Sequence, residues 1–372
     1  MRWAKLHDRV RYDLTPSGVP DLTAATLAEL GVAVTLDPGG PYGDPDLIAA
    51  IADRYGVAPD QVVLVPGASA ASVVALAAVM GHDPERGAAV LLERPLYEPI
   101  DRARQLLGLR AMPVRRSAST MFDVRAGDVD TGLRDGARAV VLTNPHNPSG
   151  RYLPRSVMSD IARRCADHGA ALIVDEVYLD AVHLVRGVRP WTAARLGDHV
   201  IATNSLTKVY GCGGLRIGWI ITGAATADRA RSVMDALSVN NAAPSMALAN
   251  AVFAQIHEFE RRYTEYYRQR EPVLRRWLDD EPLVHGYPMY GVPFAWVHLP
   301  AGVSSVALND RLRDAYDTQV VPGRFFGRDD HVRIGLASPP ADLRAGLMCI
   351  SRALRDAEPS GHRTHHVRSP NT

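Results

Sequence analysis

Short apolar runs rich in β-branched residues recur along the middle of the chain. Six of them stand at residues 62–65, 88–92, 139–143, 171–175, 200–203 and 217–222. The stretches between them carry the spacing of helices. Runs that are apolar on both faces and separated by helices are typical of parallel strands covered on both sides. The pattern therefore predicts a large α/β domain, built as an α/β/α sandwich around a mostly parallel sheet.

The pattern changes after this region. Residues 244–280 are nearly free of helix breakers, which predicts long helices leading out of the large domain. Strand-like and helical pieces then alternate, as in a smaller α+β domain. We predict an N-terminal arm that is partly shared with the small domain (residues 1–35), a large domain (36–271), a small C-terminal domain (272–357) and a flexible tail (358–372).

Composition narrows the classes of function. The 372 residues are enough for about two domains. The 42 basic and 41 acidic residues leave a net charge of +1, which offers no field for nucleic acid or a membrane surface. The three cysteines are far apart and no His/Cys cluster has metal spacing. Without an apolar leader or a run long enough to cross a bilayer, the expectation is a cytoplasmic enzyme that acts on small molecules.

Lysine is scarce in this chain. Lys5 and Lys208 are its only lysines, so nearly all of its positive charge comes from arginine. Arginine supplies charge, but its guanidinium stays protonated, whereas a desolvated amine can lose its proton and form a Schiff base. We therefore interpret Lys208, in a glycine-rich loop, as a candidate imine-forming lysine rather than an ordinary surface residue. Lys5 is interpreted as surface.

Two segments have the chemistry of a phosphate site. Ser205 and Arg216 flank Lys208, and together they place a hydroxyl, an amine and a fork-shaped cation on one loop. That set suits an aldehyde that carries a phosphate monoester. In the second segment, the first apolar run passes through a glycine into a helix whose first amides, near Ala68 and Ser69, would face an anion. An ordinary strand-to-helix turn remains the alternative there.

Polar residues that could hold a pyridine ring follow three other runs. Asp175 ends an apolar run, and a buried carboxylate needs a partner, such as a protonated pyridine nitrogen or, alternatively, a salt bridge or helix end. Tyr178 could turn its phenol to a ring hydroxyl. Asn147, between two Asn-Pro steps, could donate its amide to the same oxygen or simply form a turn. Tyr97 could stack on the ring or pack in the core.

These pieces stand in an order that resembles a known family. NPHNPSG, DEVY, SLTK-VYG-x-GGLR-IGW and VRIG are similar to the signatures of class I/II aminotransferases of the fold-type I pyridoxal-phosphate enzymes. The resemblance covers nearly the whole chain. It implies that Lys208 forms the internal aldimine and then shuttles the proton between Cα and C4′. The cofactor-binding residues that it implies are Ala68, Ser69, Tyr97, Asn147, Asp175, Tyr178, Ser205, Lys208 and Arg216.

The resemblance also implies a substrate site and a partner. Arg333 corresponds to the arginine that binds the substrate carboxylate, and Gly18 to the arm glycine that closes over the substrate. Tyr42 resembles the tyrosine that reaches the phosphate of a neighbouring subunit, which implies a homodimer with shared active sites. The substrates would be an α-amino acid and a 2-oxo acid. No second arginine matches a site for a distal carboxylate, so aspartate and glutamate are less favoured donors.

Two other functions remain open from the sequence. Some relatives keep these cofactor residues yet cyclise, oxidise, decarboxylate or eliminate, because cofactor binding and reaction outcome are separate properties. A ligand-sensing regulator on the same fold is the third hypothesis. Such a regulator is expected to carry an N-terminal DNA-binding domain, whereas this sequence is aminotransferase-like almost from its start and has a balanced charge.

Overall fold

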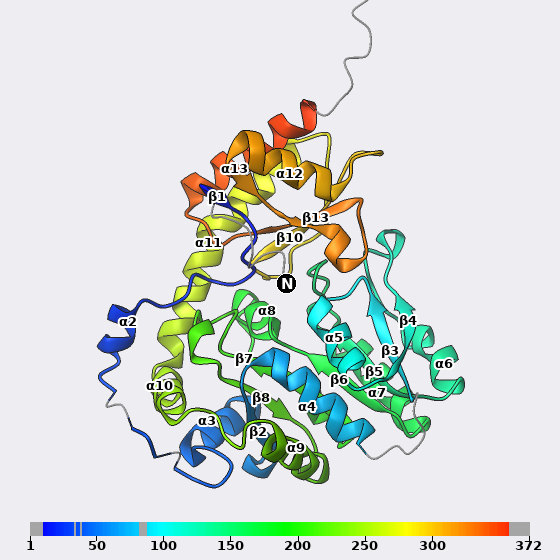
Figure 1. Ribbon diagram of the computed structural model, residues 1–372, viewed down its shortest axis with the longest axis vertical. Coiled ribbons are helices and arrows are strands. Elements are labelled where there is room, and N and C mark those ends of the chain that lie inside the picture. The colour runs from blue at the N-terminus through cyan, green and yellow to red at the C-terminus, as the bar shows by residue number, and fades with distance from the viewer. Residues whose placement is uncertain (1–9, 33–34, 38, 82–87, 357–372) are drawn as a thin grey trace, which may run out of the picture.

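The computed structural model describes residues 10–32, 35–37, 39–81 and 88–356. Lys5, the predicted tail and the start of the predicted arm lie outside these residues. In Figure 1 a large sheet with its helices fills the lower part of the molecule, and a smaller sheet with its helices lies above it. The predicted fold, an α/β sandwich with a smaller α+β part, is confirmed.

In the described residues, seven strands form the large sheet in the order β2-β8-β7-β6-β5-β3-β4. They are β2 (Val62–Val65), β3 (Ala89–Arg94), β4 (Arg110–Arg115), β5 (Ala137–Thr143), β6 (Ala171–Asp175), β7 (Val200–Ser205) and β8 (Gly218–Ile221). All six predicted runs are strands. The sheet is mostly parallel, as predicted, but β8, whose run we interpreted as a parallel strand, runs antiparallel to both neighbours, β2 and β7. A run buried on both faces has the same composition in either direction, and here the loop after β7 returns without a crossover helix.

Strand β4 was not predicted from the sequence. It pairs in parallel with β3 and ends the sheet. Val114 is its one buried residue, and its other side chains are exposed or partly exposed. An edge strand with so little burial lacks the continuous apolar run by which the inner strands were found.

Helices cover both faces of the large sheet (Figure 1). Alternate residues of one strand enter different clusters: Val90 and Leu92 pack on one face, and Ala89 and Leu91 on the other. The first face is covered by α4 (Ala68–Met80), α5 (Glu98–Leu106) and α9 (Ala224–Leu237), and the second by α6 (Gly127–Arg134) and α7 (Arg155–Asp167). Burial from both sides explains why the inner strands are almost wholly apolar.

The smaller sheet is antiparallel. Within the described part of the chain it has the order β12-β13-β10-β9. Its strands are β9 (His285–Gly286), β10 (Phe294–His298), β12 (Val321–Pro322) and β13 (His331–Gly335). Helices α12 (Ser305–Tyr316) and α13 (Pro340–Arg355) lie over it, and β1 (Tyr12–Asp13) pairs in parallel with β11 (Thr318–Gln319). The segment after β1 therefore starts at the smaller sheet.

Long helices connect the two parts, as predicted. They are α10 (Ala243–Ala254) and α11 (Ile256–Asp280). The predicted boundary at residue 271 falls inside α11, and the division into domains stays a prediction. The remaining elements are α2 (Ala24–Glu29), α3 (Pro45–Tyr55), α8 (Leu179–Arg186) and the 3₁₀ turns Pro59–Gln61, Ala118–Thr120, Ala193–Leu196, Gly213–Leu215 and Gly323–Phe326. Among the described helices, none combines the length and the apolar character needed to cross a bilayer.

Candidate active site

The carboxyl ends of three adjacent strands place the predicted polar residues at one edge of the large sheet. Thr143, at the end of β5, lies in register with Asp175 at the end of β6, and Asp175 lies in register with Thr203 on β7. Parallel strands end at the same edge, so the loops that follow them meet there. Asn147, Asp175 and Lys208 come together for this reason.

A cavity of about 520 Å³ lies at this edge. The nine residues proposed to hold the cofactor all line it, although they come from segments far apart in the sequence. The lining residues are Ala68, Ser69, Ser72, Tyr97, Pro99, Thr143, Pro145, Asn147, Asp175, Val177, Tyr178, Ser205, Thr207, Lys208 and Arg216. Ser72, Thr143 and Thr207 were not singled out in the sequence, because an isolated hydroxyl residue carries no motif.

Lys208 and Asp175 have the charge properties of reactive groups. Burial lowers the pKa of the Lys208 amine to about 8, and the charge of Arg333 acts in the same direction. Burial raises the pKa of Asp175 to about 6, although the Val177 N–H donates to its Oδ1 at 3.0 Å. An amine with this pKa is partly neutral near pH 7 to 8, as a nucleophile requires, while the carboxylate is still ionised there.

Two further side chains are held by hydrogen bonds at the rim of the cavity. The Tyr178 hydroxyl donates to Ser17 Oγ at 2.9 Å. The Asn147 backbone N–H donates to Thr143 Oγ1 at 3.0 Å, and its side-chain Oδ1 accepts from Arg333 at 3.0 Å. Asn147 therefore links the first cavity to Arg333.

The other end of the cavity has an arginine against a helix N-terminus. The Arg216 guanidinium donates to the Pro66 carbonyl at 3.2 Å and packs so closely on Gly67 that an added Cβ would lie 2.3 Å from it. Ala68 and Ser69 begin α4 directly after this glycine. Asn241, which no sequence signal indicated, donates to the Arg216 carbonyl at 3.1 Å. A guanidinium beside unpaired helix amides is a good anion site.

A second cavity of about 180 Å³ adjoins the first and shares Tyr97 and Lys208 with it. Its lining residues are Thr15, Pro16, Ser17, Tyr97, Glu98, Lys208, Val321, Phe325, Phe326 and Arg333. The Arg333 guanidinium lies between the rings of Phe294 and Phe326, at 5.4 and 5.2 Å from their centroids. Its NH2 donates to the Thr15 carbonyl at 3.3 Å, and its buried Nε has no partner among the described residues.

The N-terminal segment crosses directly over Lys208. The Val19 N–H donates to the Lys208 carbonyl at 3.0 Å, and a Cβ on Gly18 would lie 3.0 Å from the same oxygen. A side chain at this close approach would require the Lys208 segment to shift by a few tenths of an ångström. Gly18 thus lies beside the lysine, as the proposed arm residue should. Its neighbour Ser17 and the Thr15 carbonyl were missed from the sequence, because nothing local marks a residue that reaches the site through the fold.

Tyr42 is the one predicted site residue that lies away from both cavities. Its side chain is 43% exposed, and the Arg231 guanidinium lies 5.9 Å from its ring centroid. Within one subunit, then, the structure does not bring Tyr42 to the other predicted residues.

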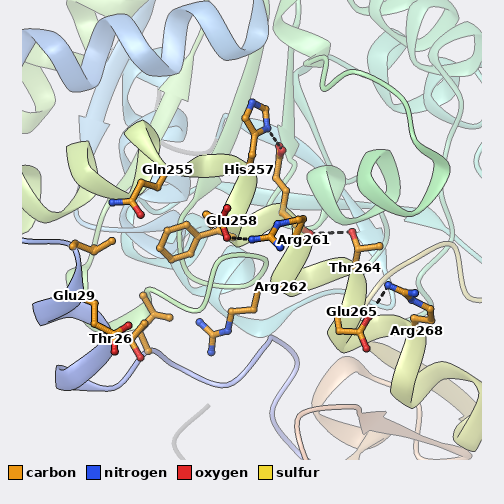
Figure 2. Close-up of a pocket in the computed structure, with 14 residues that line it drawn as sticks. Thr26, Glu29, Gln255, His257, Glu258, Arg261, Arg262, Thr264, Glu265 and Arg268 are labelled. Carbon is orange, nitrogen blue, oxygen red and sulfur yellow. Dashed lines mark hydrogen bonds and ion pairs between the residues drawn. The ribbon is translucent and has the colours of Figure 1, made fainter.

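A cavity of about 790 Å³, which exceeds both of these, lies elsewhere, between α2 and α11. Figure 2 shows that several of its charged side chains pair with one another along α11. His257 pairs with Glu260 at 2.7 Å and Arg268 with Glu265 at 2.6 Å. No residue proposed for the cofactor or the substrate lines it, and several of its charged side chains are paired with their neighbours.

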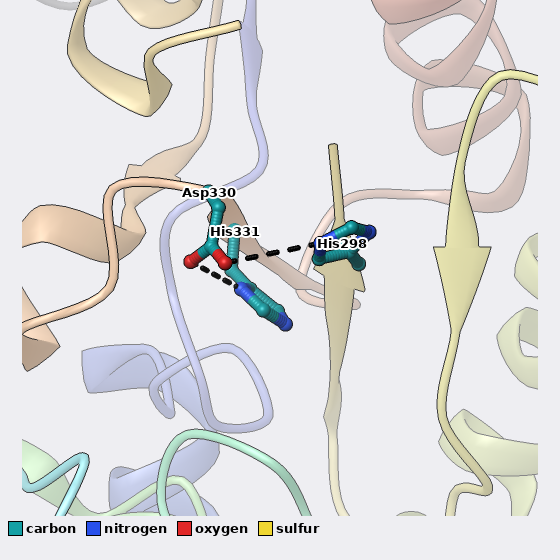
Figure 3. Close-up of side chains that lie close together, drawn as sticks. All are labelled: His298, Asp330 and His331. Atoms are coloured by element: carbon teal, nitrogen blue, oxygen red, sulfur yellow. Dashed lines mark hydrogen bonds and ion pairs between the residues drawn. The ribbon is translucent and has the colours of Figure 1, made fainter. Parts of the chain in front are cut away.

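A group of possible metal ligands also lies outside the two adjoining cavities (Figure 3). The ligand atoms of His298, Asp330 and His331 lie within 4.8 Å of one another. The Asp330 carboxylate, however, accepts from both ends of the Arg328 guanidinium, at 3.0 and 2.6 Å, and from His331 at 2.8 Å. These donors hold the pKa of Asp330 well below its usual range. A cation would have to displace Arg328, so we assign no metal to this group.

Comparison with known proteins agrees with the geometry. A family model described as aminotransferase class I and II matches residues 21–348. Arginine–pyruvate transaminase of Pseudomonas aeruginosa is 29% identical over 351 residues, which cover 90% of this chain and 88% of that protein. Capreomycidine synthase of Streptomyces vinaceus is 29% identical over 362 residues, covering 93% and 90%.

Solved structures share the fold. A pyridoxal-phosphate-dependent aminotransferase from Streptococcus suis superposes with a TM-score of 0.86 at 24% identity, covering 95% of this chain and 96% of that one. A pyridoxal-phosphate-dependent cyclase superposes with a TM-score of 0.79 at 23% identity, with the same coverages. Enzymes described by different reactions therefore share this architecture.

Proposed function

The chain belongs to the aminotransferase class I and II family, and we propose that it transfers the amino group of an α-amino acid to a 2-oxo acid. Enzymes of this family depend on pyridoxal phosphate, and its aminotransferase relatives make the chain an enzyme of this kind. The observation that carries the proposal is one arrangement: Lys208, whose amine is partly neutral, lines both cavities, one of which is also lined by Asp175 and the other by Arg333.

The residues of the cavity of about 520 Å³, which contains Asp175 and Lys208, fit the cofactor. A side chain at Gly67 would collide with the Arg216 guanidinium, and the groups around the cavity supply an amine, a carboxylate, hydroxyls and a guanidinium. When bound, pyridoxal phosphate supplies an electron sink for negative charge at the substrate Cα. In our proposal, the phosphate is held by Ala68, Ser69, Ser205 and Arg216, and the ring by Tyr97, Asn147, Asp175 and Tyr178.

Lys208 would move the proton at the substrate Cα. A group with a pKa of about 8 can both take up and release a proton near neutral pH. The arm at Gly18 and Val19 packs against the backbone of Lys208, and Gly18 also lies close to its side-chain Cδ. Asp175, ionised at the same pH, would keep a positive charge on the ring nitrogen opposite it.

Arg333 would bind the α-carboxylate of the substrate. Its plane is set by Phe294 and Phe326, and its Nε is buried without a partner among the described residues. A carboxylate that accepts from both Nε and a terminal nitrogen would satisfy this atom, in the bidentate geometry that arginine favours. An orphaned buried donor is costly, so a ligand that satisfies it gains affinity.

The smaller cavity would take the side chain of the substrate. Its volume of about 180 Å³ exceeds the ~150 Å³ of an apolar cavity known to bind benzene. Val321, Phe325 and Phe326 form apolar walls, and Glu98 adds negative charge. The two cations that line it, Lys208 and Arg333, are both needed for the reacting end of the substrate. We therefore propose a donor with a largely apolar side chain and without a second carboxylate.

A panel of amino acids mixed singly with the holoenzyme tests this function. The readouts are the spectrum of the bound cofactor, the keto acid and free ammonia. We expect leucine, phenylalanine or methionine to give one equivalent of keto acid with pyridoxamine phosphate and without ammonia. Formation of ammonia or carbon dioxide in place of keto acid would refute transamination.

A second candidate function keeps the cofactor and changes the outcome to cyclisation, elimination, decarboxylation or oxidation. The similarity to capreomycidine synthase over 93% of the chain favours it. The same panel separates the two, since arginine-like substrates would then be consumed with the cofactor returned to its starting spectrum. Any keto acid released by elimination or oxidation would come with an equivalent of free ammonia.

We also propose that the protein is a homodimer with shared active sites. Leu237 and Val239 are 58% and 57% exposed. Asn240, which follows Val239, donates to the Pro41 carbonyl at 3.3 Å, next to exposed Tyr42. A second subunit would cover these side chains, and its phosphate site would then lie within reach of Tyr42 of the first subunit. Light scattering should give the molar mass of a dimer. The Tyr42→Phe variant should bind the cofactor more weakly but remain a dimer. A monomer with full activity would contradict the proposal.

A further inference from the structure

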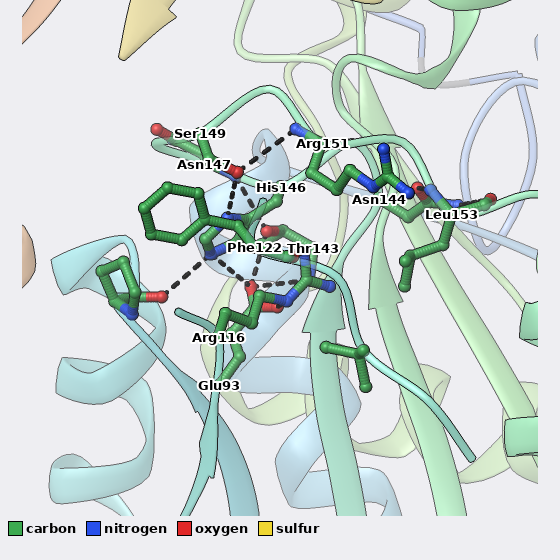
Figure 4. A network of polar contacts seen from close by, with 12 residues as sticks. Glu93, Arg116, Phe122, Thr143, Asn144, His146, Asn147, Ser149, Arg151 and Leu153 are labelled. Carbon is green, nitrogen blue, oxygen red and sulfur yellow. Dashed lines mark hydrogen bonds and ion pairs between the residues drawn. The ribbon is translucent and has the colours of Figure 1, made fainter. Parts of the chain in front are cut away.

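A buried ion pair lies beneath the cofactor cavity and is connected to it by hydrogen bonds (Figure 4). Glu93, on β3, pairs with Arg116 at 2.9 Å, and neither side chain has any exposed surface. The other carboxylate oxygen, Oε1, accepts from the Thr143 backbone N–H at 2.9 Å and from the Thr143 hydroxyl at 2.6 Å. Neither Glu93 nor Arg116 lines either cavity of the site.

The hydroxyl of Thr143 connects this ion pair to Asn147 through two hydrogen bonds. Thr143 Oγ1 accepts from the Asn147 backbone N–H at 3.0 Å. A hydroxyl has one proton, and an ionised carboxylate can only accept. The Thr143 proton therefore points to Glu93, which leaves a lone pair of the same oxygen facing Asn147. The negative charge of Glu93 sets the direction of the Thr143 hydroxyl, while the Asn147 N–H can only donate.

The ionisation of Glu93 depends on its partners. Burial raises the pKa of Glu93 to about 7, while Arg116 and the two Thr143 donors oppose the rise. At pH 8 the Glu93 carboxylate is mostly ionised, so the Thr143 hydroxyl donates to it and accepts from the Asn147 N–H. His146, 3.9 Å from Glu93, is buried and its pKa is lowered well below the ordinary value, so it stays neutral.

The loop that holds Asn147 is fixed on its other side as well. The His146 Nε2 lies 3.0 Å from the Pro95 carbonyl, which can only accept, so this nitrogen carries the proton. Its Nδ1 then accepts from the Ser149 hydroxyl at 2.6 Å. Hydrogen bonds therefore hold the loop on both sides of Asn147. Loss of the Thr143 hydroxyl should then change the position of Asn147 rather than the conformation of the rest of the loop.

We propose that Glu93 is a positioning residue, which through Thr143 fixes Asn147 for its contacts with the cofactor ring oxygen and with Arg333. The Asn147 side chain already accepts from Arg333 at 3.0 Å, so one relay would align the ring contact and the substrate cation together. This inference rests on the proposed function, which assigns Asn147 to the ring oxygen.

The test uses the holoenzyme without substrate and follows the visible absorbance of bound pyridoxal phosphate from pH 6 to 10. Thr143→Val removes the hydroxyl and keeps the shape of the side chain. A ring oxygen with a misplaced donor holds its proton more tightly, so we expect the midpoint to rise by about 0.5–1 pH unit, the size of one lost hydrogen bond. Thr143→Ser, which keeps the hydroxyl, should retain the wild-type midpoint.

Glu93→Gln should move the midpoint in the same direction and raise the KM of the amino acid more than it lowers kcat. The matched control is Glu176→Gln. Glu176 is equally buried and adjacent to Asp175, but its carboxylate accepts from the Ala193 N–H at 2.7 Å and does not line the cavity. Loss of stability alone would be common to both variants, whereas the spectral shift should be confined to Glu93→Gln.

Asn147→Ala, measured in parallel, separates the two levels of the proposal. If Asn147→Ala leaves the midpoint unchanged, the assignment of Asn147 to the ring fails. If Asn147→Ala moves the midpoint and Thr143→Val does not, the positioning role of Glu93 and Thr143 is overturned. Because Thr143→Val keeps the buried ion pair, this second outcome is decisive even if Glu93→Gln does not fold.

Discussion

Replacing Lys208 by methionine should stabilise the cofactor-free protein near pH 7.5. Methionine has a similar reach and no charge, so the variant removes the cost of holding an ammonium in a buried site. The pKa of Lys208 is lowered from 10.5 to about 8. At ~1.4 kcal/mol per pKa unit this shift corresponds to at most about 3 kcal/mol below pH 8. Because the side chain is partly exposed to the cavity, we expect a gain of about 1–3 kcal/mol.

The gain should depend on pH in a defined direction. Between pH 8 and 10.5 the unfolded chain keeps a proton on Lys208 that the folded chain has released, so the wild type becomes more stable as pH rises. The advantage of Lys208→Met is therefore full at pH 7.5, shrinks above pH 8 and is smallest near pH 10.

Urea unfolding of the apo-proteins at pH 7.5, 8.5 and 9.5 measures this difference. Lys208→Arg is the control, because its guanidinium keeps the charge at every pH and should give no gain at pH 7.5. Equal stability of Lys208→Met and the wild type, or a gain that does not change with pH, would refute the lowered pKa. It would also remove the physical reason for Lys208 to act as a partly neutral amine.

Three further predictions concern the loaded site. Asp175→Asn should weaken pyridoxal phosphate binding at least tenfold, measured by absorbance titration of the apo-protein, because the amide cannot pair with a protonated ring nitrogen; unchanged affinity would contradict this role. Arg333→Lys should raise the KM of the amino acid about tenfold or more and leave the cofactor affinity within about twofold, since lysine cannot bind a carboxylate bidentately; equal losses in both would argue against a carboxylate site. Phe325→Arg should increase the half-reaction rate with aspartate relative to leucine by placing a cation in the smaller cavity, and an unchanged ratio would show that this cavity does not hold the substrate side chain.

The predictions made from the sequence succeeded where a local pattern has one structural outcome. The buried runs at 62–65 and 171–175 coincide with β2 and β6, because short apolar runs rich in β-branched residues favour strands covered on both faces. The direction of β8 could not be predicted in this way, since burial does not distinguish parallel from antiparallel pairing. The edge strand β4 was missed because exposure allows polar residues there.

At the site, the sequence by itself identified the residues whose chemistry cannot be replaced. Lys208 stands out because the chain has one other amine side chain, and Asp175 because a carboxylate ends an otherwise apolar strand. Their motifs were enough to indicate the family and its cofactor.

The tertiary structure alone decided the environment of these residues. Ser17 reaches Tyr178 across 161 residues of sequence, and Glu93 reaches Thr143 across 50. Such contacts leave no local signal, because each residue type is ordinary where it stands. The lowered pKa of Lys208 has the same origin, since it comes from burial beneath a distant segment and from the charge of Arg333. Sequence determined which groups are present, and folding determined how far water is excluded from them, on which their reactivity depends.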